Sequence, residues 1–316
     1  MVKRSEIREA IHDPKKAFRV ANHRLDVSFG KLLFKNTAPF TQNIDGVMTR
    51  RKMQKQNKDY LKGRPKNQLA EEFKDKGHIG LGCIYEKSLI EILSSKFNSM
   101  IENEQFSVIR AERDGQVFSR GISLVAKHIP EISKLMTKEV IDIYEQYYGG
   151  PFEILDVYAW RNYHVPDSIL EKHKGVYSDD WHCDGHNTTW TKLMIYLTDV
   201  TEQDGPFNIQ TLERTKELIE KGFGSRNDPK LPKQVLEDPK YSTRYVGPKG
   251  SVVACNTTTC LHRATIPAKG HFRDIIQFQI GPSNTPLSSD WPKRLKLNKE
   301  YQNTLEQGQV KDLSIT

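Results

Sequence analysis

The sequence has few cysteines, no paired-cysteine motif and no long apolar run. Its four cysteines include no C-x-x-C pair, which argues against a zinc ribbon or a redox dithiol and favours a reducing, cytoplasmic setting. A transmembrane helix needs about 18 or more consecutive apolar residues, and the sequence contains no such run. The opening residues MVKRSEIREA lack the apolar core of a secretion signal, so we expect neither export nor membrane association.

Positive charge is in excess, but only in one part of the chain. The net charge is +8, and residues 1–70 hold 17 Lys and Arg against 6 Asp and Glu, while the rest holds 31 against 34. We therefore expect residues 1–70 to form a basic amino-terminal extension that packs on or flanks a core domain of residues 71–316. The candidate site described below lies outside this extension. That location argues against nucleic acid as the main partner, although a polyanion patch on the arm is an alternative.

Hydrophobic periodicity changes near residue 150. Helical spacing of apolar residues predicts helices over 87–102 and 131–148, the second ending at Gly149-Gly150-Pro151. Residues 22–65 are expected to hold loops and short elements. Further helices are predicted over 212–221 and 233–238, and strands over 152–163, 191–198, 243–246, 251–256 and 271–280.

Strands and helices do not alternate regularly, which disfavours a parallel doubly wound sheet. We predict one mainly β domain with flanking helices (α+β), an antiparallel barrel or jelly roll backed by the amino-terminal helices.

Two histidines and an aspartate crowd into WHCDGHNTTW, residues 181–190. Residues i and i+2 of a strand project to the same face, so the H-x-D of His182 and Asp184 can aim an imidazole and a carboxylate into one cavity. A downstream strand leads to His262. Two histidines and one carboxylate on one side of a metal form the facial site of non-haem Fe(II) oxygenases, which leaves open positions opposite.

Arg273 follows His262 after a segment containing the turn residues Pro267 and Gly270. We expect His262 and Arg273 on adjoining antiparallel strands, both facing the cavity. A fixed guanidinium at that place suits a dicarboxylate, with one end on the metal and the other in a bidentate ion pair.

These residues, in their order along the chain, resemble a known family. HCD at 182–184, DGPF at 204–207 and GPKGSVV at 247–253, followed by His262 and Arg273, resemble the Fe(II)/2-oxoglutarate-dependent dioxygenases, specifically the phytanoyl-CoA dioxygenase-like family. The resemblance covers roughly residues 74–282 and implies a double-stranded β-helix, a jelly-roll or cupin-like barrel.

The resemblance also implies the chemistry and the roles of individual residues. His182, Asp184 and His262 would bind Fe(II), and Arg273 would bind the distal carboxylate of 2-oxoglutarate. Thr191 is a further candidate for cofactor binding. The implied reaction hydroxylates or otherwise oxidises an unactivated C–H bond of a small molecule with O2, releasing succinate and CO2, and ascorbate can assist. Since halogenases of this branch replace the carboxylate ligand, Asp184 implies oxidation rather than halogenation.

Three departures from the family pattern concern the cosubstrate and the substrate. The segment NIQTLERTK at 208–216 replaces a Pro-Gly-Ser-His loop that shapes substrate pockets. Ile275 stands where many relatives carry a hydroxyl residue, and Gln279 stands where nucleic-acid demethylases of the superfamily carry a second arginine. The substrate class is therefore open.

Candidate substrate contacts lie on the strand before the motif and just after it. They are Tyr158, Trp160, Arg161 and His186. Alternation allows either Tyr158 and Trp160 or Arg161 to face inward, and the sequence leaves this parity undecided. Two other functions stay open: a zinc or manganese hydrolase with the same three ligands, and a nucleic-acid-binding protein that uses the basic arm on an inert barrel.

Overall fold

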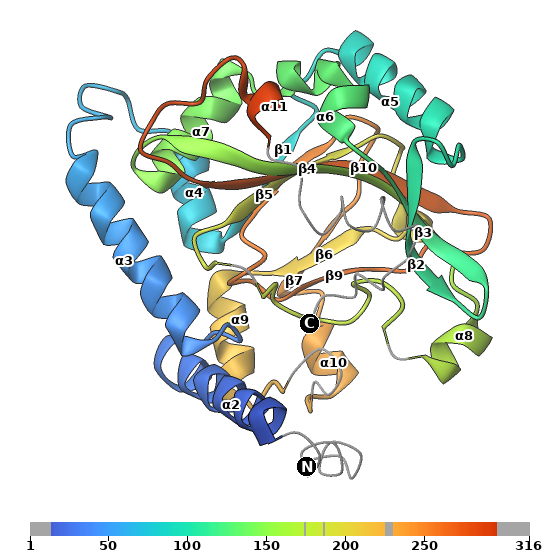
Figure 1. Ribbon diagram of the computed structural model, residues 1–316, viewed down its shortest axis with the longest axis horizontal. Helices are drawn as coiled ribbons and strands as arrows, with labels where there is room; N and C mark the ends of the chain where they lie inside the picture. The colour runs from blue at the N-terminus through green and yellow to red at the C-terminus, as the bar shows by residue number, and fades with distance from the viewer. Residues whose placement is uncertain (1–13, 174, 186, 225–229, 296–316) are drawn as a thin grey trace.

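The computed structural model describes residues 14–173, 175–185, 187–224 and 230–295 (Figure 1). The strands are β1 (His78–Gly82), β2 (Ser107–Arg113), β3 (Gln116–Ile122), β4 (Phe152–Tyr163), β5 (Thr191–Tyr196), β6 (Phe207–Gln210), β7 (Ser242–Tyr245), β8 (Val252–Cys255), β9 (His262–Ala264) and β10 (Phe272–Pro282). The helices are α2 (Pro14–Phe34), α3 (Phe40–Gln56), α4 (Gln68–Lys76), α5 (Lys87–Ile101), α6 (Val125–His128), α7 (Lys138–Tyr148), α8 (Asp167–Lys172), α9 (Leu212–Glu220), α10 (Lys233–Leu236) and α11 (Trp291–Arg294), with the 3-10 helices η1 (Pro130–Leu135) and η2 (Glu202–Asp204).

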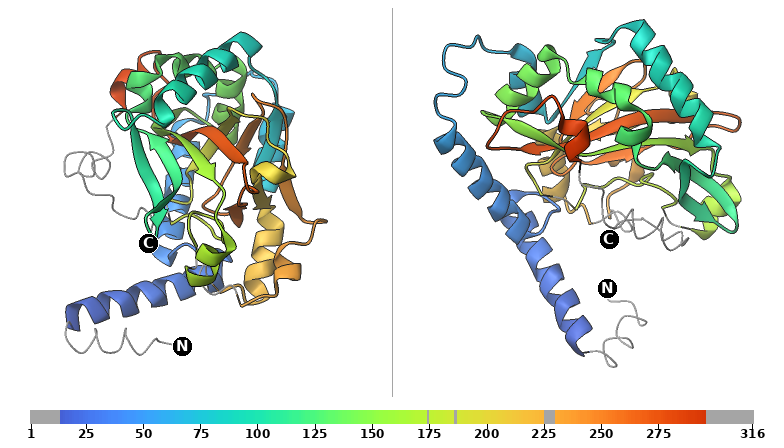
Figure 2. Two further views of the ribbon diagram at one scale, coloured as in Figure 1. Left: turned by 90° about the vertical axis from the view of Figure 1, so that its right-hand side faces the viewer. Right: turned by 45° about the horizontal axis from the view of Figure 1, so that its top comes forward.

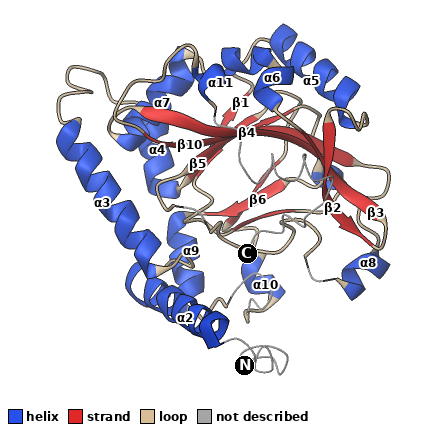
Figure 3. Cartoon of the chain, in the orientation of Figure 1, coloured by secondary structure: helices blue, strands red, loops and turns tan. Residues whose placement is uncertain are grey.

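Two antiparallel sheets face each other (Figure 3). The seven-stranded sheet has the order β1-β8-β5-β10-β4-β3-β2, and the three-stranded sheet has the order β7-β6-β9. All pairings between these strands are antiparallel. Helices α5, α6 and α7 cover the outer face of the large sheet (Figure 1). The predicted fold class, a mainly β jelly roll backed by helices, is confirmed.

Both faces of the large sheet are buried. On β10, Ile276, Phe278 and Ile280 belong to the core beneath the helices. Ile275 points the other way, into an apolar cluster between the sheets that also holds Tyr196 of β5. Alternation therefore defines an inner face, toward the small sheet, and an outer face, toward the helices.

The amphipathic helices form where the apolar spacing predicts them. On α5 the core stripe consists of Ile90, Leu93, Phe97 and Ile101. Helix α7 begins at an N-cap, where Thr137 accepts a hydrogen bond from the Val140 amide, and ends at Gly149 with φ of 71°. The predicted single element over 131–148 is in fact η1 followed by α7. No helix in the described ranges has both the length and the apolar character to cross a bilayer.

The expectation of loops and short elements over residues 22–65 is wrong. Helices α2 and α3 occupy most of this segment, and Figures 1 and 2 show α3 along one edge of the barrel with α2 extending beyond it. The apolar side chains in the described part of α2, residues 22–34, form no buried stripe. Leu25, Leu32 and Leu33 are 58%, 70% and 60% exposed, so the pattern that usually marks a helix is missing.

Helix α3 packs on the loop that follows the H-x-D motif. Asn187 Nδ2 donates to Asp45 Oδ2 over 2.8 Å, and Gln42 Nε2 donates to the Gly185 carbonyl over 3.3 Å. Gly46 is buried against Thr188, where a Cβ would overlap the threonine Oγ1 and lie 3.3 Å from its Cβ. The basic arm is therefore in contact with the barrel next to the candidate site.

We expect Gly46→Ala to destabilise the protein although alanine is the better helix former. Helix propensity alone would stabilise by up to about 1 kcal/mol, whereas overpacking a buried contact costs about 1–3 kcal/mol. Urea unfolding measures the difference, with the exposed Gln54→Ala in the same helix as control. A more stable Gly46→Ala protein would show that α3 does not approach Thr188 closely.

Candidate metal centre

The three predicted ligands converge at the edge of the small sheet. His262 begins β9, and His182 pairs with it through two backbone hydrogen bonds of 3.0 and 2.9 Å. Asp184 Oδ1 lies 3.5 Å from His182 Nε2 and 3.6 Å from His262 Nε2. One ligand atom from each residue lies within 4.8 Å of the other two. The structure thus brings the three side chains together as one candidate metal site.

Both imidazoles are oriented through their other ring nitrogen. His182 Nδ1 donates to the Asp180 carbonyl over 2.7 Å, and His262 Nδ1 donates to the Cys260 carbonyl over 3.1 Å. Because a carbonyl only accepts, each Nδ1 carries a proton, and Nε2 is the nitrogen that keeps a lone pair when the ring is neutral. Burial, and secondarily the neighbouring His182, lower the pKa of His262 well below its usual value. Neutral imidazoles with Nε2 lone pairs are the form that binds a metal.

Asp184 shares its two oxygens between different partners. Oδ1 faces the histidines, whereas Oδ2 accepts hydrogen bonds from Lys192 Nζ over 2.5 Å and Thr257 Oγ1 over 2.6 Å. The Asp184 amide donates to the Thr257 carbonyl over 2.9 Å, which fixes the backbone. Burial acts to raise the pKa of Asp184, but the charge of Lys192, with the two histidines as secondary contributors, outweighs burial and holds this pKa well below its usual value. The carboxyl is therefore an anion, as a metal ligand must be.

The donor set fits ferrous iron. Two neutral imidazoles and one carboxylate are the ligands that Fe(II) takes in facial sites, whereas a thiolate shell is typical of zinc or iron–sulfur centres. The described cysteines form no disulfide, and burial, the largest effect, raises the pKa of Cys183 to about 12. Its thiol is neutral at physiological pH, so the residue between His182 and Asp184 offers no thiolate.

Arg273 lies on the inner face of β10 and is 3% exposed. It is two residues from Ile275 of the inter-sheet cluster, and it pairs with Asn162 of β4 in the sheet register. Its Nε and Nη1 atoms are buried and have no hydrogen-bond partner within the described part of the chain. Burial lowers its pKa, but arginine stays charged in proteins. A buried cation without an anion is costly, so this position favours binding of an anionic ligand.

The relation between His262 and Arg273 differs from the prediction. They do not occupy adjoining strands, because β9 pairs with β6 in the small sheet and β10 pairs with β4 and β5 in the large one. The turn residues between them instead carry the chain from one sheet to the other. The metal ligands and the guanidinium therefore come from facing sheets.

The pairing of β4 with β10 shows which side chains of β4 face the barrel interior. Ile275 is opposite Trp160 and Ile276 is opposite Ala159. Trp160 packs on the inter-sheet cluster, and Tyr158 shares its face, with ring centroids 6.4 Å apart. Tyr158 and Trp160 are thus on the inner face, as one of the two predicted alternatives required.

Arg161 and Thr191 do not lie where a substrate or cofactor contact requires them. Arg161 is on the outer face and forms two 2.7 Å hydrogen bonds with the carboxylate of Asp274, through Nε and Nη2. Thr191 is fully buried with its Oγ1 2.7 Å from the Tyr148 hydroxyl of α7. Neither side chain therefore faces the barrel interior, as a substrate or cofactor contact would require, because alternation directs both under the helices. His186, the remaining candidate, lies outside the described residues.

Lys192 and Thr257 are the site residues that sequence reasoning missed. Thr191 faces outward, so its neighbour Lys192 faces the barrel interior. In the sheet Lys192 lies opposite Cys255 of β8 and Gln279 of β10. A lysine within the apolar strand TKLMIY was the available signal, because a lysine seldom lies on a buried face without an anionic partner. Thr257 gives no comparable signal in the sequence.

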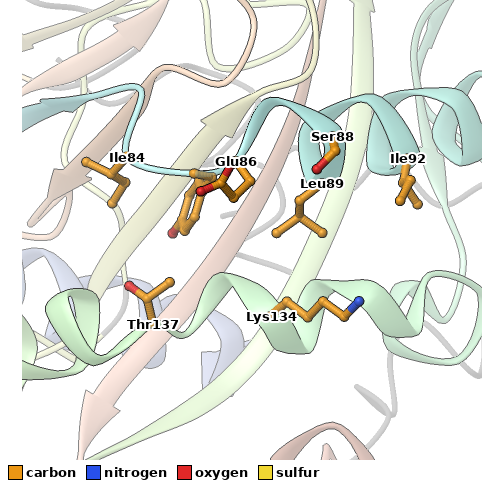
Figure 4. Close-up of a pocket in the computed structure, with 8 residues that line it drawn as sticks. Ile84, Glu86, Ser88, Leu89, Ile92, Lys134 and Thr137 are labelled. Carbon is orange, nitrogen blue, oxygen red and sulfur yellow. The ribbon is translucent and has the colours of Figure 1, made fainter.

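A separate groove lies between α5 and η1 (Figure 4). It is lined by Ile84, Tyr85, Glu86, Ser88, Leu89, Ile92, Lys134 and Thr137. None of these residues belongs to the candidate metal centre or to the inner face of the barrel.

Comparison with solved structures identifies proteins of similar fold. The hydroxyectoine-bound EctD from S. alaskensis, which also holds 2-oxoglutarate, matches at TM-score 0.50 and 13% identity over 69% of this chain and 76% of its own. HygX from Streptomyces hygroscopicus, with nickel, 2-oxoglutarate and hygromycin B, matches at TM-score 0.47 and 14% identity over 70% and 89%. The epimerase SnoN from nogalamycin biosynthesis matches at TM-score 0.48 and 12% identity over 67% and 81%.

The likeness to EctD shows that the chain has the double-stranded β-helix fold found in a 2-oxoglutarate-binding protein. At 13% identity it shows the fold alone, and the other two similarities are weaker. No protein-family model matches the sequence, and no curated protein matches it either.

We expect Arg161→Met to destabilise the fold without weakening binding of 2-oxoglutarate. The substitution leaves the Asp274 carboxylate, which is 0% exposed, without its cation, and breaking such a pair costs about 3–5 kcal/mol. Urea unfolding measures the loss, and the double variant Arg161→Met/Asp274→Leu should recover most of it. If the variant lost 2-oxoglutarate binding while its stability stayed unchanged, Arg161 would be a ligand-binding residue after all.

Proposed function

We propose that the protein is a non-haem Fe(II)/2-oxoglutarate-dependent oxygenase that oxidises an unactivated C–H bond of a small molecule, releasing succinate and CO2. The observation that carries the proposal is the unpaired, buried Arg273 facing the same barrel interior as His182, Asp184 and His262. A metal site alone would fit several reactions. A metal site with a buried guanidinium across the interior fits a metal-chelating dicarboxylate.

Each residue has a definable task in this proposal. His182 and His262 present Nε2 lone pairs, and Asp184 presents one anionic oxygen, so the three would hold Fe(II) on one side. Arg273 would receive the distal carboxylate of 2-oxoglutarate and orient the keto acid. When bound, Fe(II) and 2-oxoglutarate supply the oxidising chemistry with O2. The apolar cluster between the sheets, with Tyr196 and Ile275, limits access of water.

We also propose membership of the phytanoyl-CoA dioxygenase-like branch, on the order of the motifs along the chain. The hydroxyl residue usual two places after the arginine is replaced by Ile275, which is 3% exposed in the apolar cluster. Arg273 would therefore hold the distal carboxylate without help from that position. Tyr158 and Trp160, on the inner face of β4, are the proposed substrate contacts.

The two alternatives account for less of the site. A zinc or manganese hydrolase would use the same three ligands but gives Arg273 no task. A nucleic-acid-binding protein would use the exposed Arg50, Arg51 and Lys52 of α3 and gives the buried ligand set no task. Its binding would weaken steeply with salt and would not depend on metal.

The test begins with spectroscopy and ends with turnover. Anaerobic protein loaded with Fe(II) should develop a weak visible charge-transfer band when 2-oxoglutarate is added. A metabolite library, with Fe(II) and ascorbate, is then screened for substrate-dependent release of succinate. Asp184→Ala is the control and should abolish the substrate-dependent release of succinate. Full turnover in that variant, or no band in the wild type, would refute the proposal.

We expect Arg273→Leu to weaken binding of 2-oxoglutarate by at least ~30-fold, because truncating one partner of a buried charge pair costs about 2–5 kcal/mol. Titration of the charge-transfer band measures this affinity. The matched ligand control is 2-oxopentanoate, which keeps the chelating keto acid but lacks the distal carboxylate. Wild type should prefer 2-oxoglutarate strongly, and the variant should bind both ligands with similar affinity. Equal discrimination in the two proteins would remove Arg273 from this role.

A further inference from the structure

Lys192 is the one described side chain that brings a positive charge into contact with a proposed metal ligand. Its Nζ lies 2.5 Å from Asp184 Oδ2, and the two side chains are 15% and 12% exposed. Placing a cation beside a site for a second cation is electrostatically unfavourable once the metal binds. The arrangement therefore calls for a compensating role for Lys192.

The strand holds Lys192 firmly in this position. Its carbonyl accepts a 2.9 Å hydrogen bond from the buried hydroxyl of Tyr144 on α7. On either side it pairs with Cys255 of β8 and Gln279 of β10. The backbone of Lys192 is thus held by Tyr144, β8 and β10, and the alternation of the strand points the side chain inward, toward Asp184.

The two oxygens of Asp184 are kept distinct. Lys192 and Thr257 both donate to Oδ2, at 2.5 and 2.6 Å, while Oδ1 alone lies within 3.6 Å of both histidine Nε2 atoms. A carboxylate bound to a metal can use one oxygen or both. Two donors on Oδ2, one of them charged, disfavour its use as a second metal ligand.

We propose that Lys192 is a positioning residue that restricts Asp184 to one metal-binding oxygen and so keeps a coordination position open. The inference rests on the proposed function, since the open position matters only for a metal that must accept both 2-oxoglutarate and O2. Thr257 supports Lys192 through the same oxygen. Neither residue touches the substrate or the cosubstrate in this role.

The test substitution is Lys192→Met, which keeps an unbranched side chain but removes the charge and the donors. Two opposite effects separate this role from a structural one. Removing a nearby cation should leave Fe(II) binding as tight as in the wild type, or tighter. Freeing Oδ2 should let Asp184 bind through both oxygens and occupy the position that O2 needs.

The probe is nitric oxide, used as a stand-in for O2 on anaerobic protein saturated with Fe(II) and 2-oxoglutarate. We expect Lys192→Met to keep the 2-oxoglutarate charge-transfer band but to bind nitric oxide, followed by its electron paramagnetic resonance signal, about 10- to 100-fold more weakly. Lys192→Arg, which keeps the charge and the donors, should restore most of the binding. The melting temperature of each variant is measured alongside.

Several results would overturn the inference. Equal affinity for nitric oxide in wild type and Lys192→Met is one. Weakened Fe(II) binding together with a lowered melting temperature is another, because it indicates a structural role. If Lys192→Met does not fold, Thr257→Val tests the same oxygen and must weaken nitric oxide binding in the same direction, and no change there overturns the inference. A wild-type protein without the charge-transfer band would instead contradict the proposed function itself.

Discussion

The site depends on one pair of backbone hydrogen bonds, those that join His182 to His262. Residues directly opposite each other in an antiparallel pair project to the same face, and the two imidazole centroids lie 4.2 Å apart as a result. A separate hydrogen bond, from the Asp184 amide to the Thr257 carbonyl, fixes the backbone of the third ligand. The ligand geometry is therefore formed by sheet pairing, and a metal would find its ligands already assembled.

The division into two sheets assigns different tasks to each. The small sheet carries both histidines at one edge, and the large sheet carries Lys192 and Arg273 on its inner face. Lys192 has its anion in Asp184, whereas Arg273 has none within the described chain. Since burying a charge without a partner is costly, the interior is electrostatically incomplete at Arg273 alone. That asymmetry is the physical basis of the proposed selectivity for a ligand with a carboxylate at its far end.

The sequence predicted the elements and the ligands better than it predicted the faces. The bounds predicted for β4 match the structure, and the spacing from His182 to His262 and Arg273 identified residues that meet in one barrel. The sequence could not decide which side chains of β4 and β5 face inward, because both faces of the large sheet are buried. Neighbouring residues are then equally protected, and alternation in polarity disappears. Arg161 illustrates this. A polar residue stands at this buried position because it forms an ion pair with buried Asp274, not because it faces a ligand.

The basic arm shows why net charge was a poor guide to this protein. Helix α3 turns Gly46 and Met53 inward, whereas Arg50, Arg51 and Lys52 are exposed. Its excess positive charge therefore lies on exposed positions, whereas Gln42 and the acidic Asp45 contact the loop that follows Asp184. Charge in water is screened within about 8 Å at physiological ionic strength, whereas charge inside the barrel is screened much less. The few ionised groups between the sheets thus say more about the ligand than the many on the surface.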